Sequence, residues 1–140
     1  MIYVFVYGTL KPGECNYDRY CGAYGAIATP ARVQGRLYDL GVGYPAMTQE
    51  AGWVQGYRLT FADPAALAPL DQLEGYSPHR PAEDNDYQRL LYPVWSYPPT
   101  ADPEDLGQAW VYIMTPAQLA RYDTRRWLQA GVWPDKAPLA

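Results

Sequence analysis

The sequence predicts an α+β domain: a small barrel of mixed or antiparallel strands with helices packed around it. Three observations support this class. The chain begins with a short, strongly apolar run, several later segments alternate between apolar and polar residues, and two helix-forming segments stand apart from the strands. Runs of strands with segregated helices are typical of α+β domains, whereas strict alternation of strand and helix is typical of parallel α/β sheets.

The composition indicates one folded domain. The chain has 140 residues, of which 49% are hydrophobic, so it can bury a substantial core. We expect a single domain over residues 1–133 and a loose C-terminal tail over 134–140. A net charge of −4 without a basic cluster argues against nucleic acid and anionic membranes as partners. Because we find neither a signal peptide nor an apolar run of membrane-spanning length, we expect a cytoplasmic protein.

Residues that bind metals are sparse. The two cysteines, Cys15 and Cys21, lie close together in the chain, and the single histidine, His79, stands far from them in a proline-rich segment. This is neither the spacing of a zinc site nor a disulfide framework. We therefore expect two reduced thiols, although the spacing leaves a disulfide open. We expect no metal and no cofactor.

The N-terminal stretch combines a strand with a tight loop. Ile2 to Val6 are all apolar or aromatic, and three of them are β-branched, which predicts a strand buried on both faces. The run stops at Tyr7-Gly8-Thr9-Leu10. Gly8 allows the backbone to come close to a ligand, and successive N–H groups in such a turn can bind an anion. An ordinary strand-to-loop turn is the alternative that the local sequence leaves open.

Further strands are expected after a connector over residues 16–28, in which Tyr17 to Tyr24 can form one short helix. The expected strands are 31–40, 52–61, 87–97 and 107–114, and in the last of these apolar residues lie on both faces. The triplet Val-Gln-Gly occurs in the first two of these. A glycine inside a strand marks a bulge or a sharp bend, so we expect irregular backbone at Gly35 and Gly56.

Two longer helices are expected. Asp63-Pro64 is an N-cap followed by proline at the first helical position, and Gly75 ends the helix that starts there. Pro69 lies inside this helix and should kink or restart it. Thr115-Pro116 predicts a second helix, over residues 117–130. We expect Trp127 and Trp133 to pack this second helix down, and we expect residues 98–106 to form an exposed turn.

Glu74 lies at the edge of the apolar stripe of the first helix, which Leu67, Leu70 and Leu73 define at ~100° per residue. Partial desolvation there raises the pKa of a carboxyl group, and the helix dipole disfavours an anion in the last turn. A catalytic base needs such a raised pKa. The residues alone leave two other interpretations open: a rim carboxylate in water, or one paired with an arginine such as Arg89.

The stretch VFVYGTLKPGECNY, from Val4 to Tyr17, resembles the N-terminal signature of the γ-glutamylcyclotransferase-like family, which includes the γ-glutamylaminecyclotransferases and the AIG2-like proteins. Three later segments match the family in the same order: Leu70 to Tyr76, Tyr87-x-Arg89 and Trp110 to Tyr112. The resemblance implies the same fold, a small barrel with helices around it. The final segment of the chain carries no such motif.

The resemblance also implies an activity: cyclisation of a γ-glutamyl amine or peptide to 5-oxoproline, with release of the amine. Glu74 would then be the general acid/base. The loop of Tyr7, Gly8, Thr9 and Leu10 would hold the α-carboxylate of the substrate, and Tyr112 would line the pocket. No cofactor or metal is implied.

The main alternative is a module of the same fold that binds a small carboxylate, or regulates a partner, without turnover. A phosphate-binding loop is disfavoured, because residues 8–13 lack the Gly-Lys-Ser/Thr ending of that motif. Neither the leaving amine nor the oligomeric state follows from the sequence.

Overall fold

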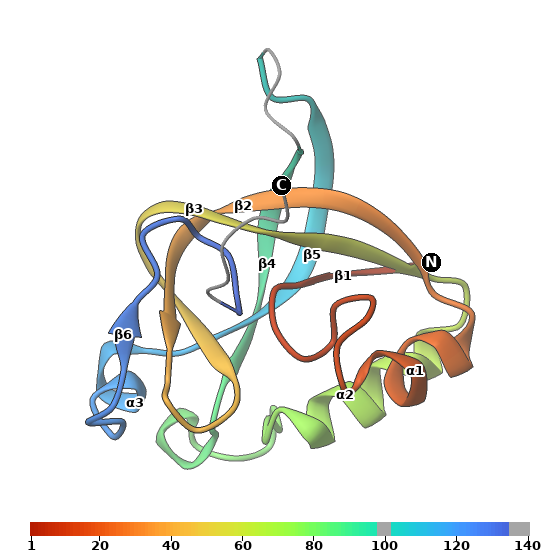
Figure 1. Ribbon diagram of the computed structural model, residues 1–140. Coiled ribbons are helices and arrows are strands. Elements are labelled where there is room, and N and C mark those ends of the chain that lie inside the picture. The colour runs from red at the N-terminus through yellow and green to blue at the C-terminus, as the bar shows by residue number, and fades with distance from the viewer. Residues whose placement is uncertain (98–101, 135–140) are drawn as a thin grey trace.

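The computed structural model describes residues 1–97 and 102–134, and its strands close into a five-stranded barrel (Figure 1). β1 pairs in parallel with β5 and antiparallel with β3, and the remaining neighbours β5–β4, β4–β2 and β2–β3 are antiparallel. The β2–β3 pairing closes the ring. The strands are β1 (Ile2–Val6), β2 (Ile27–Asp39), β3 (Pro45–Phe61), β4 (Gln88–Ser96) and β5 (Asp105–Ile113). The predicted mixed barrel is therefore confirmed.

Short helices lie outside the barrel, and most of them belong to the connections between strands. α1 (Tyr17–Tyr20) and the 3₁₀ turn η1 (Gly22–Tyr24) follow β1, where the sequence predicts one short helix. The 3₁₀ turn η2 (Pro64–Ala66) and α2 (Leu67–Leu73) link β3 to a loop that contains η3 (Ala82–Asp84). α3 (Pro116–Leu119) follows β5. In Figure 1, α1 and α2 lie along one end of the barrel.

β1 is buried on both faces, as the sequence predicts. Val4 and Val6 pack in a core cluster shared with Ala66 and Leu70 of the η2–α2 segment, so this cluster lies between the barrel wall and the helices. Phe5, which points to the other face, belongs to a second cluster formed by inward residues of the remaining strands. The strand thus separates two cores, and the loop that follows it leaves from the middle of the molecule.

The two Val-Gln-Gly triplets have different structural roles. The β2–β3 ladder shifts register between Gln34 and Arg36, so the predicted irregularity at Gly35 is confirmed. At Gly56 the ladder is regular, and the predicted bulge is wrong there. A Cβ on Gly56 would lie 2.1 Å from the carbonyl oxygen of Val6, which explains the glycine: it allows β3 to approach β1 closely.

The first predicted helix forms with a change of type. Asp63 caps it by accepting a hydrogen bond from the N–H of Ala65, and the chain passes from 3₁₀ to α geometry at Leu67. Pro69 lies in the first turn of α2, where its missing N–H removes no helical bond. The helix ends at Gly75, as predicted, and this glycine has the positive φ of 61° that is typical of a residue just after a helix.

The second predicted helix, over residues 117–130, is wrong beyond its first turn. α3 ends at Leu119, and the chain then forms β6 (Arg126–Trp127), which pairs with the end of β2. The hydroxyl of Thr124 donates to the carbonyl of Leu40, 2.5 Å away, and holds the chain in this course. Tertiary pairing therefore overrides local helix propensity. Consequently Trp127 is 46% exposed, and Trp133 packs in the inner core cluster rather than against a helix.

Other boundaries differ in detail. β2 begins at Ile27 and β3 at Pro45, whereas the sequence predicts starts at residues 31 and 52. Both strands are longer than predicted because they pair with each other in one long hairpin. Both cysteines are free thiols, with Cys15 exposed and Cys21 buried. Residues 98–101 of the predicted turn and 135–140 of the predicted tail lie outside the described residues.

Candidate active site

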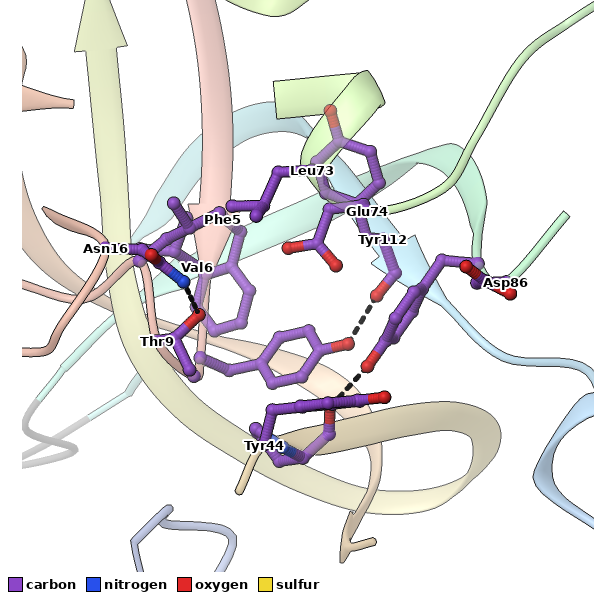
Figure 2. Close-up of a pocket in the computed structure, with 14 residues that line it drawn as sticks. Phe5, Val6, Thr9, Asn16, Tyr44, Leu73, Glu74, Asp86 and Tyr112 are labelled. Atoms are coloured by element: carbon purple, nitrogen blue, oxygen red, sulfur yellow. Dashed lines mark hydrogen bonds between the residues drawn. The ribbon is translucent and has the colours of Figure 1, made fainter. Parts of the chain in front are cut away.

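A cavity of about 210 Å³ opens at the C-terminal end of β1, between the barrel and the end of α2 (Figure 2). Segments far apart in the sequence meet around it: the end of β1 with its loop, the start of β3, the end of α2, and the residues just before β4 and at the end of β5. The residues that line it are Phe5, Val6, Tyr7, Gly8, Thr9, Leu10, Asn16, Tyr44, Pro45, Leu73, Glu74, Asp86, Tyr87 and Tyr112.

The loop after β1 forms one wall and is fixed by its own hydrogen bonds. The N–H of Lys11 donates to the carbonyl of Gly8 at 3.0 Å, and the side-chain amide of Asn16 donates to the Thr9 hydroxyl at 2.9 Å. The backbone N–H groups of Gly8, Thr9 and Leu10 donate to no acceptor within the described residues. Three successive donors therefore remain available on a rigid loop beside the cavity, an arrangement suited to an anion.

Two buried tyrosines tie this wall to its neighbours. The hydroxyl of Tyr7 donates to the carbonyl of Tyr112 at 2.5 Å, and the hydroxyl of Tyr87 donates to the carbonyl of Pro45 at 2.7 Å. Burial raises the pKa of both hydroxyls well above its ordinary value, and the nearby charge of Glu74 contributes. Both tyrosines therefore stay neutral and serve as fixed cross-links between strands.

Glu74 follows the last residue of α2, and its carboxylate points into the middle of the cavity, as Figure 2 shows. Thr9 and Asn16 lie on one side of it and Asp86 on the other. Within the described residues the carboxylate accepts no hydrogen bond and forms no ion pair. Arg89, the alternative partner considered from the sequence, binds Asp71 instead at 2.7 Å. The acid is thus left unpaired beside the free donors of the loop.

The environment raises the pKa of Glu74 to about 7. Desolvation in the cavity is the main cause, and the negative charge of Asp86 adds to it. Near neutral pH the carboxyl group is therefore divided between its two protonation states. A group in this condition can both take and return a proton.

A polar clamp anchors α2 one turn before Glu74. Asp71 accepts a hydrogen bond from the hydroxyl of Tyr112 at 2.7 Å and forms its ion pair with Arg89. The Arg89 guanidinium also lies over the ring of Trp110, 4.6 Å from its centre. The clamp joins the helix to β4 and β5, so the position of Glu74 is set by the barrel rather than by the short helix alone.

The structure brings the predicted site residues together. Tyr7, Gly8, Thr9, Leu10, Glu74 and Tyr112 all line the one cavity. The hydroxyl of Tyr112 donates to Asp71 and its carbonyl accepts from Tyr7, so this residue offers the cavity its ring. Sequence reasoning assigned no site role to Asp86 or Tyr87, although both lie in or beside the Tyr-x-Arg match.

Neither metal nor membrane features are found in residues 1–97 and 102–134. No group of three or more His, Cys, Asp or Glu side chains there could hold a metal ion. No helix in the described part of the chain is long and apolar enough to cross a membrane.

Comparison with known proteins defines the family. The family model described as "Gamma-glutamyl cyclotransferase, AIG2-like" matches residues 4–135, and the chain belongs to this family. It is 36% identical over 86 residues to a protein of Halalkalibacterium halodurans named "Putative gamma-glutamylcyclotransferase"; the match covers 60% of this chain and 67% of that protein. It is also 36% identical over 73 residues to a Niallia circulans protein named "Gamma-L-glutamyl-butirosin B gamma-glutamyl cyclotransferase", covering 52% of this chain and 46% of the relative.

Solved structures agree on the fold. An AIG2-like protein from Mus musculus superposes with a TM-score of 0.65 at 22% identity, over 99% of this chain and 91% of that one. The protein ytfP from Escherichia coli gives a TM-score of 0.61 at 25% identity, over 96% and 97% of the two chains. At such low identity these structures support the architecture and leave the chemistry to be argued from the cavity.

Proposed function

We propose that the protein cyclises a γ-glutamyl amine or peptide to 5-oxoproline and releases the amine, with Glu74 as general acid/base. The observation that carries this proposal is the position of one unpaired acid, with a pKa of about 7, in the same cavity as three free backbone donors. Family membership supports the enzyme class. The names of the two curated relatives refer to the same type of reaction.

The donors of Gly8, Thr9 and Leu10 would bind the α-carboxylate of the substrate. Held there, the γ-glutamyl chain can fold so that its α-amine meets its own γ-carbonyl near Glu74. Such orientation is worth effective molarities on the order of 10⁵ M or more. The substrate therefore brings its own nucleophile, and the protein has to supply position and proton transfer.

The reaction balances without water. The α-ammonium of the substrate first loses a proton to the Glu74 carboxylate. The freed amine attacks the γ-carbonyl carbon and forms the new C–N bond of a five-membered ring. The original amide C–N bond then breaks as Glu74 gives this proton to the departing nitrogen. Glu74 next takes the second proton from the ring nitrogen and passes it to the released amine. The products are 5-oxoproline and the amine in its protonated form, and Glu74 is again a carboxylate.

The test of this function is release of 5-oxoproline from a panel of γ-glutamyl amines and dipeptides, followed by chromatography. We expect stoichiometric 5-oxoproline and amine from at least one compound. Binding of a γ-glutamyl compound without any release across the panel would instead favour the non-catalytic carboxylate-binding module of the same fold.

The pH dependence should report Glu74. The carboxylate form is the base, so kcat/KM should rise with pH along an acid limb whose pKa is about 7. Asp86→Asn removes a charge that raises this pKa, so the limb should move to lower pH. An acid limb near the ordinary pKa of a glutamate, about 4.3, would contradict the proposed role.

A further inference from the structure

The two ends of the cavity have opposite polarity. The free backbone donors lie at the end formed by Thr9 and Asn16, and Asp86 lies on the opposite side of Glu74 (Figure 2). A substrate held by its carboxylate at the donor end and reacting beside Glu74 extends its leaving group toward Asp86. The surroundings of Asp86 therefore decide which leaving groups fit.

Asp86 is held firmly while its carboxylate stays free. The N–H of Asp86 donates to the carbonyl of Gly75 at 3.0 Å. A Cβ on Gly75 would lie 2.2 Å from Oδ2 of Asp86, so the Asp86 carboxylate packs against the backbone of Gly75, the residue after Glu74. The side chain is exposed, and within the described residues it accepts no hydrogen bond and forms no ion pair. An unpaired carboxylate at a cavity mouth is free to meet a charge on the ligand.

The nearby cations are already engaged elsewhere. Arg80 donates to the side-chain oxygen of Asn85 and to the carbonyl of Gly75, and Arg121 donates to the carbonyl of Glu83. Neither forms an ion pair with Asp86. Tyr44 lines the cavity with 38% of its surface exposed and so offers an aromatic ring at the same mouth. A carboxylate and an aromatic ring at one end of a cavity together favour the binding of a cation there.

We propose that Asp86 and Tyr44 form a cation subsite for the leaving group, so that the preferred substrate is a γ-glutamyl amine whose leaving amine carries a second, protonated amino group at its far end. A linear diamine has this chemistry. The proposal rests on the proposed cyclisation and adds to it the charge of the group released.

A matched pair of substrates tests the subsite. N-γ-glutamyl-1,4-diaminobutane and N-γ-glutamyl-pentylamine have leaving groups of the same length, and differ in whether the end is an ammonium or a methyl group. The wild-type protein should prefer the diamine by about fivefold in kcat/KM, as expected for an exposed ion pair and a cation–π contact. The preference should fall as salt is raised, because exposed charges are screened.

Asp86→Asn should reduce the ratio of the two kcat/KM values to about one. Because both substrates are compared on one variant at one pH, the effect of Asp86 on Glu74 cancels from the ratio. Asp84→Asn is the control: this exposed carboxylate lies two residues away and outside the cavity lining, and its removal should keep the wild-type ratio.

The outcomes separate the two proposals. Equal turnover of both substrates by the wild-type protein, or a preference that survives Asp86→Asn, overturns the cation subsite and leaves the cyclisation standing. If neither compound releases 5-oxoproline, calorimetric binding of the same pair gives the comparison without turnover. Equal binding then overturns the subsite, whereas tighter binding of the diamine, lost in Asp86→Asn, supports it even as the cyclisation fails.

Discussion

Glu74→Gln is expected to lower kcat by about 1,000-fold, the range typical of general acid–base groups. Glutamine has the size of glutamate and keeps the cavity filled, but it cannot accept the proton of the substrate ammonium or return one to the leaving nitrogen. The measurement is 5-oxoproline release under substrate saturation. Normal turnover by this variant would remove Glu74 from the mechanism.

The same variant should be at least as stable as the wild-type protein. The folded-state pKa of Glu74, about 7, lies above the ordinary value, so its carboxylate form destabilises the fold increasingly as pH rises from about 4.3 through 7. Glutamine does not ionise, so thermal melts at pH 8 should show an equal or higher midpoint. Glu83→Gln, an exposed position outside the cavity lining, is the control and should keep full activity.

Gly8→Ala is expected to lower kcat/KM by about 100-fold. A Cβ at this position would lie 2.8 Å from both Cγ and Cδ of Pro45, whose ring cannot rotate away. The loop must therefore move relative to the opposite wall, and the three free donors move with it. A displacement of about 1 Å in a positioning group can cost a factor of 10².

Gly22→Ala is the matched control for Gly8→Ala. Its added Cβ would make only ordinary contacts, the nearest at 3.5 Å from a ring carbon of Tyr17. This variant should retain wild-type kinetics. Thermal melts distinguish a moved loop from an unfolded protein, and wild-type kcat/KM in a folded Gly8→Ala variant would show that this loop does not position the substrate.

Local patterns were sufficient for much of the fold. The apolar run of β1 predicts burial on both faces because nothing in it is polar, and Asp63-Pro64 and Gly75 mark the helix that ends beside Glu74 because capping is a short-range effect. The failure over residues 117–130 has a different cause. There the chain is held by pairing with β2 and by the bond from Thr124 to Leu40, and neither partner is visible from the local sequence.

The residues of the site likewise include some that the local sequence reveals and some that it does not. Glu74 could be singled out because an acid at the edge of an apolar stripe is unusual, and the loop after β1 because glycine follows a buried strand. Asp86 gives no such signal: it ends a polar loop, and its position at the cavity depends on contacts distant in sequence, among them its backbone bond to Gly75. The clamp of Asp71, Tyr112 and Arg89 joins three elements that are distant in sequence. Its contacts could therefore be identified only from the folded structure.

A crystal structure with bound 5-oxoproline tests the central claim most directly, namely that the loop after β1 and Glu74 serve one γ-glutamyl site. We expect the product carboxylate to accept hydrogen bonds from the N–H groups of Gly8, Thr9 and Leu10, with the lactam ring within hydrogen-bonding distance of Glu74. A product carboxylate bound away from these N–H groups, or a ring out of reach of Glu74, would contradict the account.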